Sequence, residues 1–141
     1  MRLRYLLDTN ALSEPIRPQP NAAFMKKFRT HRLHVAISSI TWNEALFGLH
    51  RLPNGKRKDQ IAEYLLDVVA KSIPVLPYDA PAAEWHAVER ARLQALGRVT
   101  PFADGQIAAI AKVNELVVVT NNSVDFEPFE GVAQQRWWSP P

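Results

Sequence analysis

The chain of 141 residues contains no cysteine. Disulfide bonds, thiolate metal ligands and cysteine nucleophiles are therefore excluded, and a reducing environment is expected. The chain also has no apolar run close to the ~20 residues that span a bilayer. Its first apolar stretch, residues 5–7, is too short for the hydrophobic region of a secretory signal. We therefore expect a cytoplasmic protein with no recognisable export signal and no membrane contact.

Acidic residues are scarce in the first part of the chain. Residues 1–58 contain 11 Lys and Arg but only 3 acids, Asp8, Glu14 and Glu44, which gives a net charge of +8. Residues 59–141 contain 6 Lys and Arg and 11 acids, a net charge of −5, so the two parts sum to the formal charge of +3. That total does not by itself indicate a nucleic-acid-binding protein. The first part is nevertheless a basic surface on which any carboxylate stands out.

Glycine is also rare, and the 5 glycines form no phosphate-binding loop. The sequence contains no internal repeat and no low-complexity linker. A length of 141 residues with 47% hydrophobic residues is typical of one globular domain with a buried core. We therefore expect a single domain over residues 1–141.

Short apolar runs alternate with amphipathic segments along the chain. The apolar runs predict strands at residues 5–7, 34–37, 73–76 and 116–120, and an edge strand at 132–135. The amphipathic segments predict helices at residues 22–30, 42–49, 56–71, 80–96 and 101–114. This alternation predicts an α/β fold, a three-layer α/β/α domain with a central parallel sheet of four to five strands.

Local signals set several of these boundaries. Asn21 and Thr100 are good N-caps, and Pro101 suits the first helical position after Thr100. Gly97 is expected to end the helix before it. Residues 8–10 are expected to form a loop that carries polar groups beyond the end of the first strand.

Three carboxylates fall at the ends of predicted elements. Asp8 follows the first strand, Glu44 comes shortly after the second, and Asp104 opens the helix before the valine-rich strand. Ligands bind outside the carboxyl ends of the strands in an open parallel sheet, so we expect the three acids to converge there. Carboxylates placed close together must take up protons or hold a cation. With oxygen ligands and no cysteine, the expected cation is Mg²⁺ or Mn²⁺.

Each acid also has a purely structural explanation. Asp8 can cap the segment that follows it. Glu44 lies three residues after Thr41, which is the spacing of a capping box. Asp104 lies in the first turn of its helix, where the helix dipole favours an anion. The functional interpretation therefore rests on the shared position of the acids.

Other polar and aromatic groups are weaker candidates. His31 and His34 span a helix end and a strand start, which favours packing over metal binding. The run 56–58 is most simply a solvated helix start, although it could bind a phosphate backbone. Trp137 and Trp138 could stack on bases, but a terminal aromatic pair more often packs on its own core or a subunit interface.

Four segments in order carry a family resemblance: residues 7–15 (LDTNALSEP), Glu44 within ITWNE, residues 102–109 (FADGQIAA) and residues 119–122 (VTNN). Together they resemble the PIN domain of VapC-type toxins. The opening at residues 13–21 is similar to the FitB-like branch in particular. The resemblance covers nearly the whole chain and is thinnest between residues 51 and 70.

The resemblance implies a Mg²⁺- or Mn²⁺-dependent endoribonuclease that acts on RNA as the toxin of a type II toxin–antitoxin pair. It also implies a homodimer that contacts DNA through a cognate DNA-binding antitoxin. It assigns catalysis and metal binding to Asp8, Glu44 and Asp104. Four neighbours, Thr9, Asn10, Thr120 and Asn122, are placed to orient the carboxylates or a water. The flanking RNA backbone is expected on basic residues among Arg17, Lys26, Lys27 and Arg29.

The chain departs from the family pattern at its fourth acidic position. Where many relatives have Asp, this chain has Asn122, with Asp125 three residues further on. An amide brings no charge, so a second metal position should be weakened while catalysis with one metal stays intact.

Two alternatives remain. One is a PIN-fold nucleic-acid-binding regulatory module with weak or no catalysis, which only Asn122 supports. The other is phosphoaspartyl transfer on Asp8, which is disfavoured because Asn10 stands where that chemistry needs a second Asp.

A homodimer is also expected from the apolar helix faces, which exceed what one sheet covers. These faces carry Trp42, Leu46 and Leu49 on one helix and Ile61, Leu65 and Val68 on the next.

Overall fold

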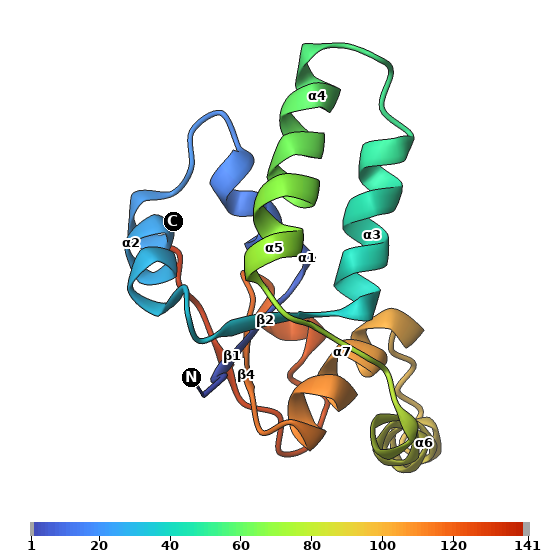
Figure 1. The fold of residues 1–141 in the computed structure, drawn as a ribbon. Coiled ribbons are helices and arrows are strands. Elements are labelled where there is room, and N and C mark those ends of the chain that lie inside the picture. Colours follow the sequence, from blue (N-terminus) through green and yellow to red (C-terminus); the bar gives the residue numbers. More distant parts are fainter. Residues whose placement is uncertain (1, 140–141) are drawn as a thin grey trace.

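The computed structural model describes residues 2–139 and contains one sheet of five parallel strands, in the order β3-β2-β1-β4-β5 (Figure 1). The strands are β1 (Tyr5–Leu7), β2 (Val35–Ser38), β3 (Val75–Leu76), β4 (Val117–Val119) and β5 (Gln134–Gln135). β1 lies at the centre, where Leu6 pairs with Ala36 on one side and Val118 on the other. The predicted α/β class and parallel sheet are confirmed.

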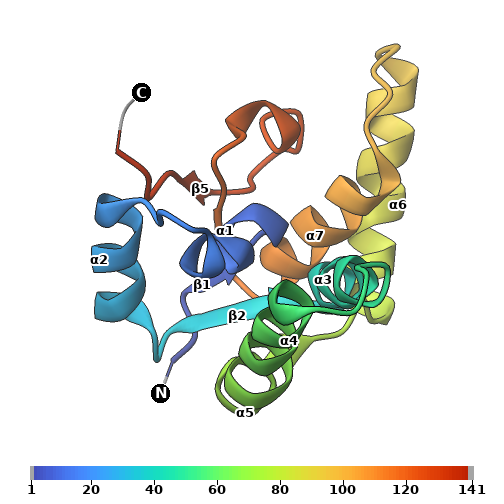
Figure 2. The ribbon, with the colours of Figure 1, turned by 90° about the horizontal axis from the view of Figure 1, so that it is seen from above.

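Seven helices surround this sheet within residues 2–139. They are α1 (Thr9–Ser13), α2 (Ala22–His31), α3 (Ser39–His50), α4 (Lys56–Ala62), α5 (Ala70–Ser72), α6 (Ala80–Ala95) and α7 (Phe102–Val113). Short 3-10 turns occur at Glu14–Ile16 and Ser123–Asp125, and a π-helical segment, Glu63–Val69, joins α4 to α5. Seen from above, α6 and α7 lie together on the side away from α2 (Figure 2).

Each face of the sheet has its own hydrophobic core. Successive side chains of a strand point to opposite faces, so Leu7 enters one core and Leu6 the other. The Leu7 core contains Phe24 of α2 and Leu49 of α3. The Leu6 core contains residues of α6 and α7. This burial on both faces explains why the strands are continuous apolar runs.

Several predicted boundaries are wrong by a few residues. Residues 8–10 are not a loop, because Asp8 caps α1 and the helix begins at Thr9. Thr100 does not cap α7, which begins at Phe102 with Pro101 as the preceding residue and no side-chain cap. The helix expected at 56–71 is interrupted by the π-helical segment. The cap at Asn21 and the helix end at Gly97, where φ is 72°, are confirmed.

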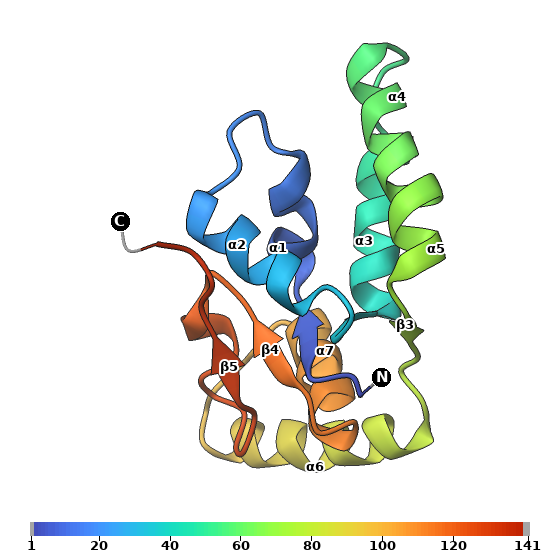
Figure 3. The ribbon, with the colours of Figure 1, turned by 60° about the vertical axis from the view of Figure 1, so that its left-hand side comes forward.

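The apolar helix pair expected to form a dimer surface mostly packs inside this chain. α3 and the helix from α4 to α5 stand side by side beyond the sheet (Figure 3). Leu49 and Leu65 on this pair are each only 3% exposed. Its exposed large apolar side chains are Phe47, Leu66 and Val68. Within residues 2–139, no helix combines the length and apolar character needed to cross a membrane.

Candidate active site

Four acids from four segments face one cavity of about 190 Å³ at the carboxyl edge of the sheet. Asp8 follows β1, Glu44 lies on α3, Asp104 lies in the first turn of α7, and Asp125 ends the 3-10 turn after β4. We call this the acid cavity. Its remaining lining residues are Thr9, Asn10, Ile107 and Phe126. The structure therefore brings Asp8, Glu44 and Asp104 together, because parallel strands end at the same edge.

Asp8 is both a helix cap and a wall of the acid cavity. Its Oδ1 accepts a hydrogen bond of 2.8 Å from the backbone N–H of Ala11, which caps α1. The Thr120 hydroxyl also donates to this carboxylate and is itself fixed by the backbone N–H of Asn122 at 2.9 Å. Burial nevertheless raises the pKa of Asp8 above its ordinary value, against the effect of these hydrogen bonds. The structural and functional explanations of Asp8 are therefore compatible.

Glu44 does not form a capping box. The N-cap of α3 is Ser38, whose Oγ accepts from the backbone N–H of Thr41 at 3.0 Å. Glu44 lies further along the helix, and its Oε2 accepts a hydrogen bond of 3.1 Å from the Thr9 hydroxyl. The structural explanation based on Thr41 is wrong, and Glu44 is held instead by a residue of the acid cavity.

The carboxyl group of Asp104 is affected both by its burial and by the other acids of the cavity. Burial raises its pKa to about 6, with further contributions from the negative charges of Asp125, Glu44 and Asp8, in that order. Its position in the first turn of α7 does not offset these effects. A cation in the acid cavity would relieve this repulsion.

Asp125, which the sequence only suggested as a substitute for Asn122, supplies the fourth carboxylate. Asn122 does not line the acid cavity, and its side-chain N–H donates to Asp125 Oδ2 at 2.8 Å. The spacing of three residues between them is a usable signal, because one helical turn brings such residues onto the same side. The acid cavity therefore has a fourth carboxylate although Asn122 stands at the fourth acidic position, and the weakened second metal position stays a prediction.

The position of Asp104 depends on a close contact between α6 and α7 at the next residue, Gly105. His86 of α6 is 2% exposed, and its Nδ1 lies 2.8 Å from the Tyr78 hydroxyl. The ring packs directly against Gly105, the residue after Asp104, and a Cβ at that position would overlap it. Sequence analysis missed this pair, because nothing local to His86 indicates which helix it faces.

The acid cavity suits a hard divalent cation in one respect and not in another. Its polar side chains offer carboxylate, amide and hydroxyl oxygens, which Mg²⁺ and Mn²⁺ prefer as ligands. Within residues 2–139, however, no three His, Asp or Glu side chains are spaced closely enough to chelate one ion. Mg²⁺ commonly binds through one or two carboxylates and keeps several waters, so this spacing fits a hydrated ion.

The other candidates from the sequence lie outside the acid cavity. Trp138 is 8% exposed and packs on Phe24 with ring centroids 4.7 Å apart, so the terminal pair belongs to the core as expected. His31 packs between Tyr5 and Trp137. Arg17 forms a salt bridge of 3.2 Å with Glu14, which removes it from the group of unpaired cations.

Two features define the class of this protein. One is the five-strand parallel sheet with helices on both of its faces, and the other is the acid cavity at the carboxyl edge of that sheet. Residues 5–129 match the model of the PIN domain, and the chain belongs to the PIN domain family. The resemblance found in the sequence is thus confirmed.

Named relatives match most of the chain. Toxin FitB of Neisseria gonorrhoeae is 38% identical over 124 residues, 86% of this chain and 89% of that protein. The tRNA(fMet)-specific endonuclease VapC of Shigella flexneri is 35% identical over 139 residues, 96% of this chain and 98% of that protein. A solved structure of FitAB bound to an IR36 DNA fragment superposes with a TM-score of 0.87 at 34% identity and covers 97% of each chain. DNA-bound VapBC of Salmonella typhimurium gives 0.80 at 28% identity, covering 96% of this chain and 98% of that one.

Proposed function

We propose that this protein is a metal-dependent endoribonuclease that cleaves RNA phosphodiester bonds as the toxin of a type II toxin–antitoxin pair. The acid cavity carries the proposal: four carboxylates face one small space, and the pKa of Asp104 is raised to about 6 by burial and by the other three acids. Carboxylates that repel one another without a basic partner are typical of a cation site. The relatives named as a toxin and as a VapC endonuclease support the nuclease assignment.

The residues of the acid cavity divide the work in this proposal. Asp8, Glu44 and Asp104 would hold the ion, directly or through its bound waters, with Asp125 as a fourth carboxylate. When bound, Mg²⁺ or Mn²⁺ supplies an activated water for attack on phosphorus and neutralises charge on the phosphate oxygens.

The neighbouring polar residues fix these carboxylates before substrate arrives. Thr9 holds Glu44, and Thr120 holds Asp8. Asn122 holds Asp125. Asn10 is exposed at the rim of the acid cavity, where its amide is placed to orient a water. Pre-positioned ligands avoid a reorganisation cost at the moment of reaction.

The partners follow from the relatives and the surface. FitAB and VapBC were solved bound to DNA, and we extend to this chain a cognate antitoxin that makes the DNA contact. We propose a homodimer that forms through the exposed apolar side chains of α3 and of the π-helical segment, namely Phe47, Leu66 and Val68. Sedimentation at micromolar concentration tests the dimer, which a monomer would contradict.

The alternative of a non-catalytic nucleic-acid-binding module rested on Asn122 alone. Because Asp125 supplies a carboxylate in the acid cavity, that observation no longer favours it.

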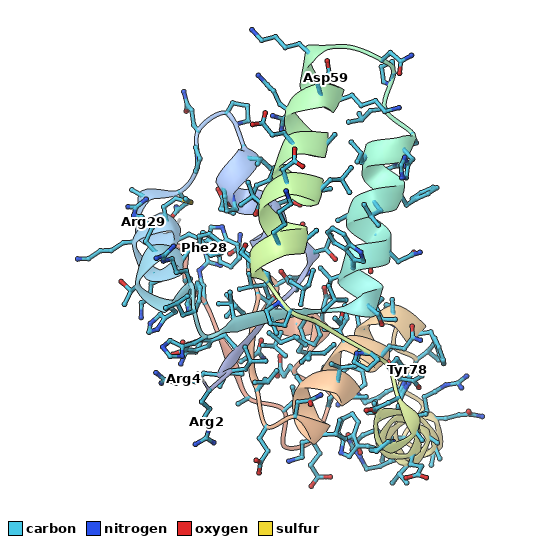
Figure 4. The ribbon with its side chains drawn as sticks, viewed as in Figure 1. Arg2, Arg4, Phe28, Arg29, Asp59 and Tyr78 are labelled. Carbon is cyan, nitrogen blue, oxygen red and sulfur yellow. The ribbon has the colours of Figure 1, made fainter. Side chains whose placement is uncertain are left out.

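The test of this function is RNA cleavage by the purified protein with and without Mg²⁺. We expect cleavage that is abolished by EDTA and restored by Mg²⁺ or Mn²⁺. Asp8→Asn should abolish it while keeping the cap of α1, since Asn caps helices as well as Asp. Asp59→Asn is the matched control, because Asp59 lies at the outer end of the α3–α4 pair (Figure 4). Full activity of Asp8→Asn would refute the assignment.

A further inference from the structure

A second, larger cavity lies between α2 and the C-terminal segment. Its volume is about 540 Å³, which is in the range that holds a group of small-molecule size. It is lined by Lys26 and Lys27 of α2 and by Arg136, and no acidic side chain among residues 2–139 lines it. We call it the basic cavity.

The cations of the basic cavity are unpaired. Within the described chain, neither lysine nor Arg136 forms a salt bridge. The Arg136 guanidinium donates to the carbonyl oxygens of Asn121 and Ser139, at 3.4 and 3.3 Å. Two of its five N–H donors are engaged by neutral acceptors, and the others remain available for an anion.

The wall that carries Arg136 is held firmly in place. Next to it, the indole N–H of Trp138 donates to the buried Glu14 Oε1 at 2.7 Å. The Asn21 amide donates to the Ser139 hydroxyl at 2.9 Å, which ties the segment to the start of α2. The backbone that carries Arg136 is therefore tied to α2, which lowers the entropy that this segment loses when it binds an anion.

The basic cavity shares Arg136 with a neighbouring hollow at the carboxyl edge of the sheet. A hollow over the ends of β4 and β5 is lined by Thr120, Asn121 and Gln134, and it ends at Arg136. Thr120 also donates to Asp8 in the acid cavity. Thr120 itself is only 2% exposed, so the surface path runs over the Ser123–Asp125 turn, where Ser123 lines the hollow and Asp125 lines the acid cavity. From the hollow the path leads to Arg136 and the two lysines.

The opposite charges at the two ends of this path indicate what kind of molecule binds along it. A polyanion that reaches four carboxylates is repelled unless cations compensate its charge nearby. The basic cavity supplies these cations at the other end of the path. A single strand is favoured over a duplex because it can follow a narrow, bent path and bind through its backbone.

Resting on the proposed function, we propose that the basic cavity binds a backbone phosphate of the RNA strand whose neighbouring segment enters the acid cavity. Lys26, Lys27 and Arg136 contact the phosphate, and the hollow beside Thr120 holds the intervening nucleotides. This subsite contributes to affinity and to strand position, and it takes no part in bond cleavage.

The test measures binding of a single-stranded RNA in the non-cleaving Asp8→Asn background. Lys26→Ala/Lys27→Ala and, separately, Arg136→Gln should each weaken binding, the double variant by roughly tenfold. The slope of log Kd against the logarithm of the salt concentration should fall by about 0.7 for each lost phosphate contact. The control is Arg2→Ala/Lys71→Ala, which removes the same charge elsewhere; Arg2 lies at the opposite end of the sheet (Figure 4). The NMR signal of the His31 ring, which lines the basic cavity, should shift when RNA binds.

The outcomes separate this subsite from the proposed function. RNA binding that falls equally in both double variants would overturn the subsite while leaving the nuclease intact. The subsite would also be overturned if Lys26→Ala/Lys27→Ala or Arg136→Gln lost binding to duplex DNA, to a poly-glutamate peptide or to inorganic phosphate but bound RNA as tightly as before. A wild-type protein that neither binds nor cleaves RNA would overturn the proposed function itself.

Discussion

At the scale of single residues, Asp104 links the stability of this protein to its site. Burial and three neighbouring acids raise its pKa to about 6 from the ordinary 3.8. The folded protein therefore holds this proton more tightly than the unfolded chain. Its contribution to stability is fully present below pH 3.8 and is lost as the pH rises through about 6.

Asp104→Asn should therefore stabilise the metal-free protein at pH 7.5. Asparagine does not ionise, so the repulsion and the burial of charge disappear together. We expect Tm in EDTA to rise by a few degrees at pH 7.5, and the difference from wild type to shrink towards pH 4.5. Added Mg²⁺ should raise Tm of the wild type more than Tm of the variant. Asp67→Asn, which removes an exposed acid, should change neither comparison; a lower Tm for Asp104→Asn at pH 7.5 would contradict this account.

Asp125 should matter more for activity than Asn122. Asp125→Asn removes a carboxylate from the acid cavity, whereas Asn122→Ala removes only the group that positions it. We expect Asp125→Asn to lower kcat/KM for RNA cleavage by about 10- to 100-fold, and Asn122→Ala to lower it less. Glu127→Gln makes the same charge change two residues away and should leave kcat/KM unchanged. A larger loss in Asn122→Ala than in Asp125→Asn would reverse the assignment.

At the scale of elements, patterning predicted the strands, the long helices and the cap at Asn21, but not the starts of α1, α3 and α7. Thr41 and Ser38 are both able to cap α3, and only the position of the chain leaving β2 selects Ser38. α1 has five residues and no long apolar face, so its formation depends on the cap by Asp8 and on packing against the sheet. Such short elements are set by tertiary contacts that a local pattern does not contain.

Gly105→Ala should separate the packing of α7 from its helix propensity. A Cβ at this position overlaps the His86 ring, so the first turn of α7 must shift and carry Asp104 with it. We expect a loss of about 1–3 kcal/mol in the free energy of unfolding, measured with urea, and reduced RNA cleavage.

Gly48→Ala is the matched control within α3, where a Cβ meets nothing within 4 Å. It should stabilise the protein by about 0.5–1 kcal/mol, as alanine does in a helix interior. Equal effects of the two substitutions would show that the contact with His86 is unimportant.

At the scale of the whole molecule, the convergence of the acids followed from one topological rule. Asp8, Glu44 and Asp104 were expected at one edge because parallel strands share their carboxyl ends, and the acid cavity contains all three. The identity of the fourth acid did not follow, because the choice between Asn122 and Asp125 depends on the geometry of a single turn. Lys26 and Lys27 were expected to bind the RNA backbone, but Arg136 and the cavity that it completes could not be predicted, since α2 and residues 136–139 meet only in the folded chain (Figure 3).

The central claim is that this acid cavity hydrolyses RNA with a bound divalent ion. The most direct measurement is the chemistry of the cleaved ends after incubation of purified protein with a defined RNA and Mg²⁺. Attack by water on phosphorus leaves a phosphate monoester on one product and a free hydroxyl on the other. We expect these ends, their absence in EDTA, and their absence with Asp104→Asn. Products ending in a 2′,3′-cyclic phosphate, formed equally well in EDTA, would contradict the account.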